Sequence, residues 1–257
     1  MGCAAPSETE FTPDFEWLNT LCITYENELS IKKSFENEYI IFSGELQSGK
    51  PKCGRIDFKD KESNLLYFIG KIDSIINCQL AGEGLLMQAG KKSDIQMRGK
   101  IKNSTLNGLG ELVQHDSTHI GTFVNGVLVK GCKKYNKGHS VTGYFQNGVK
   151  HGICTDQTPT GYVKALFEDN KVVKKLESVK KDENGSYHWI YKGEPTKYSG
   201  IKTHTPPESY DGEDKQIKYK WTYSGQFNDN GGEHGKGTLT FENGETISGQ
   251  WNNGNSL

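Results

Sequence analysis

The stretches Phe123-Val-Asn-Gly126, Phe145-Gln-Asn-Gly148 and Phe167-Glu-Asp-Asn170 begin 22 residues apart in the chain. Each places an aromatic residue shortly before a dipeptide suited to a tight turn. A fixed interval of about 20–50 residues is the sequence signature of a repeat array. The chain is therefore expected to build one small unit several times, and such arrays more often present surfaces than carry out chemistry.

A pattern of large–x–small–x–large residues extends these stretches in both directions. Its small positions are Gly44, Gly70, Gly99, Gly121, Gly143, Ala165, Gly225 and Gly249, with a weaker copy at Gly200. The closing large residues include Phe123, Phe145, Phe167, Phe227 and Trp251. Residues two apart share one face of a strand, so each unit predicts a β-strand. A glycine inside a strand is unfavourable, and its recurrence predicts that an aromatic side chain from the neighbouring repeat lies over the bare backbone.

Turn signals separate these units. Seven Asn-Gly dipeptides occur, and Gly-x-Gly segments such as Gly82–Gly84 and Gly235–Gly237 lie between the strands. Asn-Gly readily adopts the positive φ angles that tight hairpins require. Each repeat is therefore predicted to be one antiparallel hairpin. The predicted fold class is all-β: an elongated, single-layer, twisted antiparallel sheet of consecutive hairpins.

The segment from Tyr223 to Gly244, which reads YSGQFNDNGGEHGKGTLTFENG, resembles the MORN repeat (membrane occupation and recognition nexus). Residues 143–152 resemble the same repeat, and weaker copies extend the resemblance over roughly residues 40–254. Membership of the MORN family implies a rod of hairpins used for scaffolding or docking. The resemblance also implies that His151 and His234, which precede turn glycines, are structural.

The chain is expected to divide into three parts. Residues 1–10 are predicted to be a flexible polar tail. Residues 11–39 carry apolar residues mostly at odd positions, which predicts a divergent N-terminal β cap over the first hairpin. Residues 40–257 are predicted to be the repeat array, with insertions at about 171–197 and 203–218, where the regular interval is broken.

Composition excludes several classes of function. The chain has 31 basic and 32 acidic residues and a net charge of −1, so no basic field is available to attract nucleic acid. No apolar run approaches the length of a membrane span, and no secretory segment follows Met1. Cys132 and Cys154 are one repeat apart, about 9.5 Å across two strand spacings, which is too far for a disulfide. A cytoplasmic location is therefore expected.

No motif predicts catalysis or metal binding. The Gly-x-Gly segments lack the residues that complete a phosphate-binding loop, and the seven histidines form no H-x-x-H or H-E-x-x-H set. No G-x-S-x-G elbow occurs. We therefore expect no enzyme activity, no cofactor and no metal.

The function predicted from these features is a non-enzymatic scaffold that docks protein partners, plausibly in a cytoskeletal or ciliary assembly. A helix or an extended peptide would lie along the face opposite the repeat anchors, or a strand would add at the C-terminal edge. The open C-terminal edge also predicts a homodimer. The residues predicted to line the partner face are Arg98, Lys100, Thr122, Val124, Thr142 and Tyr144.

Two alternatives remain open from the sequence. Gly2 and Cys3 resemble the start of dually acylated proteins, which would make the chain a peripheral membrane tether together with the lysines at 171–181. Pro6 departs from the myristoylation pattern, which requires Ser or Thr at that position. The second alternative is a detached regulatory module of an enzyme, because MORN repeats precede catalytic domains in other proteins.

Overall fold

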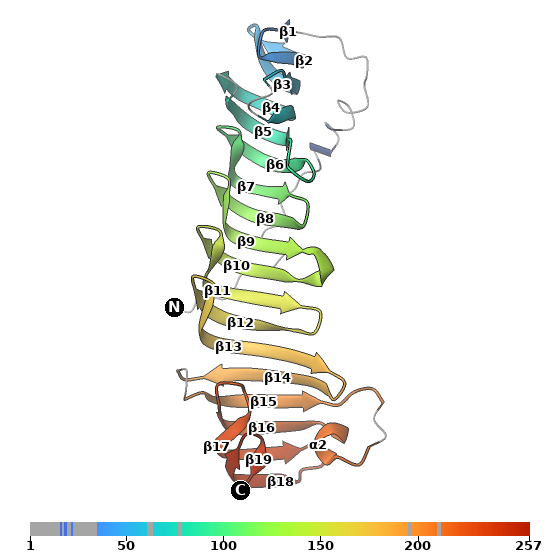
Figure 1. The fold of residues 1–257 in the computed structure, drawn as a ribbon, viewed down its shortest axis with the longest axis vertical. Coiled ribbons are helices and arrows are strands. Elements are labelled where there is room, and N and C mark those ends of the chain that lie inside the picture. The colour runs from blue at the N-terminus through green and yellow to red at the C-terminus, as the bar shows by residue number, and fades with distance from the viewer. Residues whose placement is uncertain are drawn as a thin grey trace. The chain divides into compact units, whose positions relative to one another are not determined.

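The structure is a computed structural model that describes Glu16, residues 18–19, Cys22 and residues 35–60, 64–76, 79–194, 197–209 and 212–257. These residues form an all-β chain whose 19 strands belong to one antiparallel sheet, which confirms the predicted fold class. Within the described residues, helical structure is confined to α2 (Lys215–Lys218), a 3-10 turn at Asn136–Gly138 and four residues near the N-terminus. Figure 1 shows β1 to β9 following one another in chain order.

Contacts divide the chain into two compact units, each treated separately below. The N-terminal unit holds the described residues up to Asn136 and residues 142–148. Its strands are β1 (Phe35–Glu36), β2 (Ile40–Gln47), β3 (Lys50–Phe58), β4 (Leu65–Ile76), β5 (Gln79–Gln88), β6 (Ile95–Lys102), β7 (Thr105–Val113), β8 (Ser117–Val124), β9 (Val127–Tyr135) and most of β10 (Ser140–Gln146).

The C-terminal unit holds residues 137–141 and 149–257. Its strands are β11 (Val149–Thr158), β12 (Gly161–Glu168), β13 (Lys171–Asp182), β14 (Gly185–Lys192), β15 (Ser199–Thr205), β16 (Trp221–Phe227), β17 (Glu233–Phe241), β18 (Thr246–Asn252) and β19 (Asn255–Ser256).

Three of the seven Asn-Gly dipeptides, at 125–126, 147–148 and 253–254, adopt positive φ at both residues, as their sequence predicts. Asn147 and Gly148 both have positive φ, 50° and 81°, between β10 and β11. Asn125 and Gly126 repeat this geometry at 49° and 79°. Two successive positive φ angles match the right-handed twist of the flanking strands, which is why these dipeptides close the hairpins tightly.

The repeat glycines pair with one another across the sheet. In the N-terminal unit each anchor glycine faces a glycine of the return strand, and the row continues unbroken from β2 to β9. The row consists of Gly44, Gly54, Gly70, Gly84, Gly99, Gly110, Gly121 and Gly131. A shorter row in the C-terminal unit joins Gly200, Gly225, Gly237 and Gly249.

At Gly44, Gly70 and Gly225 the ring over the glycine comes from two residues earlier in the same strand, so the prediction of a neighbouring repeat as its source is wrong at these positions. Phe68 stands two residues before Gly70, and a Cβ on Gly70 or Gly84 would lie 2.7 Å from its Cζ atom. Because a ring is longer than one residue step, it spans its own glycine and the paired glycine. Phe68 is fully buried in this way, which stabilises the unit by about 2 kcal/mol.

The two faces of the N-terminal unit therefore differ. The glycine face carries Phe42, Phe68 and Phe123 beside the glycine row, and all three are at most 1% exposed. The second face carries the alternate residues, among them Ile69, Leu85 and Arg98, which follow one another across β4, β5 and β6.

The C-terminal unit has an aromatic core on the face that carries Tyr223. Tyr223 packs against Phe227 and Trp251, with ring centroids 5.4 Å and 5.3 Å apart. The buried members of this cluster are Trp189, Tyr191, Tyr198, Trp221, Tyr223, Phe227, Leu239, Phe241 and Trp251. A single layer offers little depth, and large flat rings bury the most apolar area per residue under that constraint.

The predicted N-terminal β cap is wrong for the first described residues. Glu16, Leu18, Asn19 and Cys22 are helical, and only Phe35–Glu36 is a strand among the described residues of 11–39. Leu18 and Cys22 are four residues apart and buried, whereas Glu16 and Asn19 are exposed. That spacing places both on one helix face, and it prevails locally over the odd-numbered apolar pattern. Residues 1–10 lie outside the described part of the chain.

The two predicted insertions are mostly regular structure. The interval after Ala165 holds the hairpin of β13 and β14 rather than a loop. Gly200 consequently lies in the return strand β15, where it pairs with Tyr191 on one side and Gly225 on the other. Within the predicted insertion at 203–218, residues 203–205 complete β15 and residues 215–218 form α2. The irregular segment is therefore shorter than expected.

Candidate functional site

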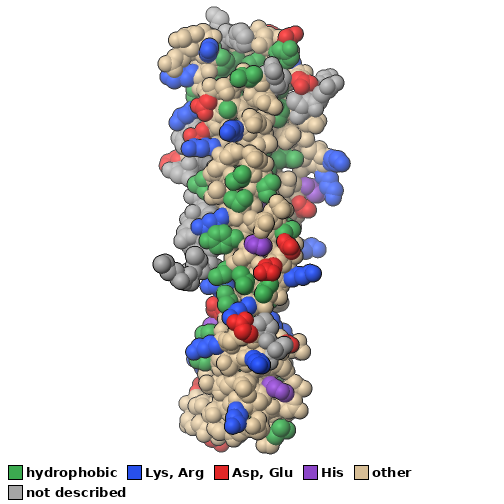
Figure 2. All heavy atoms as spheres, turned by 90° about the vertical axis from the view of Figure 1, so that its left-hand side faces the viewer, with side chains coloured by type: hydrophobic (Ala, Val, Ile, Leu, Met, Phe, Trp, Pro, Cys, Tyr) green, Lys and Arg blue, Asp and Glu red, His purple; other side chains and the backbone are tan. Residues whose placement is uncertain are grey.

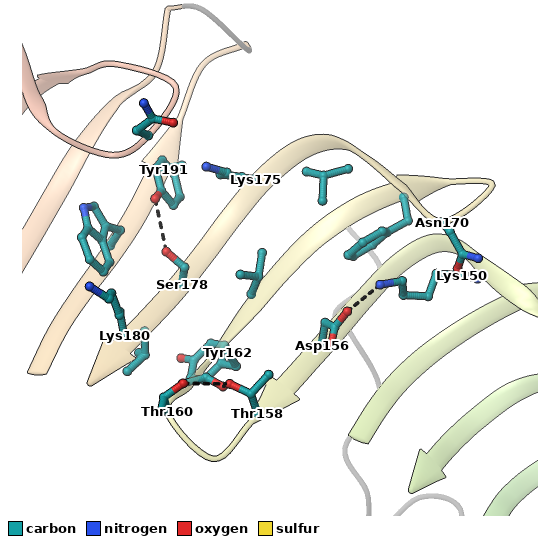
Figure 3. Close-up of a pocket in the computed structure, with 17 residues that line it drawn as sticks. Lys150, Asp156, Thr158, Thr160, Tyr162, Asn170, Lys175, Ser178, Lys180 and Tyr191 are labelled. Atoms are coloured by element: carbon teal, nitrogen blue, oxygen red, sulfur yellow. Dashed lines mark hydrogen bonds and ion pairs between the residues drawn. The ribbon is translucent and has the colours of Figure 1, made fainter. Parts of the chain in front are cut away.

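A groove of about 580 Å³ lies across β11–β14 in the C-terminal unit (Figure 3). Strands β11 to β14 supply most of its walls, and Asn230, which precedes β17, also lines it. Its lining comprises Lys150, Asp156, Thr158, Thr160, Gly161, Tyr162, Val163, Phe167, Asn170, Val172, Lys175, Ser178, Val179, Lys180, Trp189, Tyr191 and Asn230. Its volume lies in the range of about 300–1,000 Å³ typical of ligand sites.

The groove exists because residues are small here where other repeats carry rings, and carry side chains where other repeats have glycine. Val163, Ser178 and Trp189 face one another in the row that continues through Lys202 to Tyr223. Val163 and Ser178 are small where Tyr223 carries a ring that fills the space above its glycines. Ala165, which pairs with Lys175, and Tyr191, which pairs with Gly200, carry side chains where other repeats have glycine. Irregularities in the β12–β13 pairing accompany this change.

An ion-paired carboxylate stands at one end of the groove. Asp156 contacts Lys150 through one carboxylate oxygen and His139 Nε2, at 2.7 Å, through the other. Burial alone would raise the pKa of Asp156, but the hydrogen bonds from Lys150 and His139 outweigh it and lower that pKa. The Lys150 ammonium also lies 4.5 Å from the centre of the Phe167 ring. Asp156 is thus an ionised carboxylate whose charge is balanced by Lys150.

Lys175 and Tyr191 form the opposite side of the groove. Lys175 Nζ donates to the backbone carbonyl of Asp229 at 2.8 Å and lies 5.8 Å from the Tyr191 ring centre. The Tyr191 hydroxyl is 3.2 Å from Ser178 Oγ (Figure 3). Burial raises the pKa of Tyr191, so its phenol stays neutral near pH 7 and offers one donor and one acceptor.

A second polar cluster joins Tyr162, Glu177 and His188. The Tyr162 hydroxyl donates to Glu177 at 2.6 Å, and His188 Nε2 lies 2.9 Å from the same carboxylate oxygen. Burial and this hydrogen bond raise the pKa of Tyr162 to about 12. The hydrogen bond from Tyr162, helped by His188, lowers the pKa of Glu177 despite its partial burial. Ser178 is bonded to Tyr191 rather than to this histidine, so the hydroxyl and the base that meet beside the groove are the Tyr162 phenol and the Glu177 carboxylate.

The residues predicted to form the partner face lie on the second face of β6, β8 and β10. Arg98 Nη1 is 3.9 Å from Glu111 on β7, and its Nε is buried without a hydrogen-bond partner in the structure. Val124 is 49% exposed, whereas Thr142 is buried. Lys100 is exposed, and Thr122 and Tyr144 are half-buried. The six residues are therefore not equally available to a partner.

The same face contacts the chain's own N-terminal residues. Leu18 and Cys22 pack with Ile69 and Leu85 in a buried cluster, with Tyr67 and Met87 beside it. Leu85 pairs directly with Arg98, so this contact adjoins the predicted partner face. Sequence reasoning missed it, although the four-residue spacing of Leu18 and Cys22 was the available signal.

The other predicted site residues fall into two groups. The large anchors Phe123, Phe145, Phe167, Phe227 and Trp251 are all buried. Gly2 and Cys3, proposed for acylation, lie outside the described residues. The lysines at 171–181 lie in β13 rather than in a loop, and three of them are engaged: Lys174 with Glu194, Lys175 with the Asp229 carbonyl and Lys180 with Asp182.

The remaining features are consistent with a surface of mixed character. Figure 2 shows acidic and basic side chains interspersed over the face in view, in line with the near-zero net charge. Across the described ranges, no cluster of three or more His, Cys, Asp or Glu side chains suits a metal ion. No disulfide joins Cys22, Cys53, Cys132 and Cys154, the cysteines that the structure describes. No helix in the described part of the chain has the length and apolarity to cross a membrane.

No family model matches this sequence, and no curated protein matches it. The MORN resemblance therefore remains a prediction from the residues quoted above.

Proposed function

We propose that this chain is a non-enzymatic docking platform of the MORN-repeat type, which holds protein partners in the cytoplasm, in a cytoskeletal or ciliary assembly. The observation that carries the proposal is the contact of Leu18 and Cys22 with Ile69 and Leu85. Two apolar residues one helical turn apart are buried on the second face, which is the mode in which an amphipathic helix docks.

The chemistry of the groove also favours binding over catalysis. Its one lining carboxylate, Asp156, is held by Lys150 and His139, and its Ser178 hydroxyl is bonded to a neutral phenol. A nucleophile needs an adjacent base, and a general base needs a free lone pair near the substrate. Groups satisfied in this way bind and orient a ligand.

The test compares two variants of the full-length protein by proximity labelling in its native cell. Lys100→Glu combined with Val124→Asp changes two exposed positions of the second face, and Lys91→Glu combined with Lys92→Glu changes an exposed loop by the same kind of charge. Partners labelled by the wild type should be lost with the first variant and kept with the second. Equal labelling by both variants would remove the second face from the proposal.

We also propose that the chain forms a homodimer through β18. One edge of β18 pairs with β17 along six residues, whereas β19 pairs with only Trp251 and Asn252 on the other edge. An edge of this kind offers N–H and C=O groups to another strand. Light scattering should show a molar mass that rises with concentration; a monomer at every concentration rejects the dimer.

A further inference from the structure

We propose that the groove across β11–β14 is a binding site for an acidic peptide segment that inserts one large apolar side chain. The inference deepens the docking function proposed above and rests on it. It assigns the groove to a partner's extended segment, separate from the second face of the N-terminal unit.

The floor of the groove sets the requirement for an apolar side chain. Phe167, Trp189 and Tyr191 line the groove together with Val163, which pairs with Ser178 and stands at the position where several other repeats carry a ring. Val172 stands at the wall with 46% of its surface exposed. An inserted ring or branched side chain would occupy the volume that Tyr223 fills in its own repeat. Burial of that side chain would contribute through the hydrophobic effect.

The charges around the rim determine which charge the peptide should carry beside its inserted side chain. Lys150, Lys175 and Lys180 line the groove, and Asp156 is the one carboxylate among its lining residues. The Lys150 ammonium balances the charge of the Asp156 carboxylate, and Asp182 balances the charge of Lys180 at 2.9 Å. The Lys175 ammonium donates to a neutral carbonyl, that of Asp229, so this contact does not balance its charge. A carboxylate beside the inserted side chain would complement Lys175.

The rim also suits a peptide backbone. Thr158 and Thr160 lie together on one side of the groove, and Asn170 lies beside Lys150 (Figure 3). Hydroxyl and amide groups can both donate and accept, which is what the alternating N–H and C=O groups of an extended chain require.

The experiment titrates the full-length protein with fluorescein-labelled, end-blocked peptides and follows fluorescence anisotropy. The probe is Asp-Glu-Phe-Glu-Asp, compared with Lys-Lys-Phe-Lys-Lys and Asp-Glu-Ser-Glu-Asp. The acidic phenylalanine peptide should bind about tenfold more tightly than either of the others. Only this peptide offers both an apolar side chain for the floor and carboxylates for the basic rim. Equal binding of the acidic and basic peptides would overturn the inference. Unlabelled phenylacetate that competes as strongly as the unlabelled acidic peptide would identify a small-acid site instead and would also overturn it.

Three variants locate the binding. Val163→Phe restores the large residue of the other repeats and should weaken the acidic peptide about tenfold. Lys175→Gln should weaken it about threefold to tenfold by loss of one charge contact, and Lys174→Gln, which changes a lysine outside the groove lining, should leave it unchanged. If Val163→Phe does not fold, Val172→Asp changes an exposed wall residue and should weaken the same peptide. Binding that survives these groove variants overturns the inference.

The two proposals fail in different ways. If the acidic peptide does not bind while proximity partners still depend on Lys100 and Val124, the groove assignment is wrong and the docking platform stands. If Val163→Phe weakens peptide binding while no partner depends on the second face, the groove is a peptide site and the second face is not the docking surface.

Discussion

The ring of Tyr223 lies over the bare backbone of Gly237 in the adjacent strand, and a Cβ added to Gly237 would overlap its hydroxyl oxygen and two ring carbons. Tyr223 is fully buried and donates its hydroxyl to the Gln226 carbonyl at 3.1 Å. It therefore has little freedom to move away. Glycine is needed at position 237 because of this ring.

Gly237→Ala is expected to lower the free energy of unfolding by about 1–3 kcal/mol, since overpacking a filled site forces the ring out of place. Urea denaturation measures this loss. The control is Lys236→Ala, an exposed neighbour on the opposite face, which should change stability by less than about 0.5 kcal/mol. If the two variants are equally stable, the ring does not confine this glycine.

The buried ion pair of Lys202 and Glu233 gives a second prediction. Their atoms are 2.8 Å apart, the side chains are 12% and 9% exposed, and the Lys202 ammonium lies 5.1–5.4 Å from the rings of Tyr187, Trp189 and Trp221. Lys202→Met leaves Glu233 buried without its cation and should cost about 3 kcal/mol.

The added change Glu233→Gln should recover part of that loss, because it removes the unpaired charge. Lys174→Met, whose partner Glu194 is 74% exposed, serves as the matched control and should cost less than about 0.5 kcal/mol. Chemical denaturation of the four proteins settles the comparison. Equal losses from Lys202→Met and Lys174→Met would contradict a special role for the buried pair.

His119 gives a prediction on pH. Burial, assisted by the neighbouring Lys133 and opposed by Asp116, lowers the pKa of His119 from 6.5 to about 4. Between these pH values His119 is protonated in the unfolded chain but not in the folded chain. The free energy of unfolding therefore falls as the pH drops from about 6.5 to 4. The loss should be about 1–2 kcal/mol, less than the full shift implies because His119 is only half-buried.

Denaturation midpoints at pH 7 and pH 4.5 test this effect. His119→Gln should reduce the difference between the two midpoints, since glutamine does not titrate. The carboxylates Asp156 and Glu177, whose pKa values are lowered, lose their contribution only at still lower pH. An unchanged difference in the variant would assign the pH dependence to other groups.

Leu18 tests the contact between the N-terminal residues and the second face. It is fully buried against Ile69 and Leu85, so Leu18→Ala should cost about 2–4 kcal/mol if this contact unfolds together with the sheet. Hydrogen exchange of β4 and β5 should accelerate as well. Asn19→Ala alters the exposed neighbour and should have little effect on either measurement. Protection of β4 and β5 that is the same in Leu18→Ala would show that the contact does not protect the sheet.

Several features of the fold follow directly from local signals. The Asn-Gly turns, the two-residue spacing of Phe42 and Gly44 and the 22-residue interval each act within a single hairpin, so the pattern predicts them without knowledge of the rest. The burial of Phe123, Phe145 and Phe167 is a consequence of that same pattern.

The errors arose where a local pattern permitted two structures. Alternating apolar residues before residue 35 are compatible with a strand, yet Leu18 and Cys22 satisfy a helix that has a sheet face to cover. The longer interval between Ala165 and Gly200 looked like an insertion. It contains a regular hairpin whose anchor position is held by Tyr191 instead of glycine.

The repeating hairpin can be predicted from local sequence, because turn chemistry and strand alternation are properties of neighbouring residues. The position of the groove and the face that contacts the N-terminal residues are visible only in the folded chain. Both depend on register: the pairing of Val163 with Ser178 and of Leu85 with Arg98 brings together side chains from separate strands. Whether such side chains leave a groove or fill a contact depends on which strands pair, and no local sequence pattern specifies that pairing.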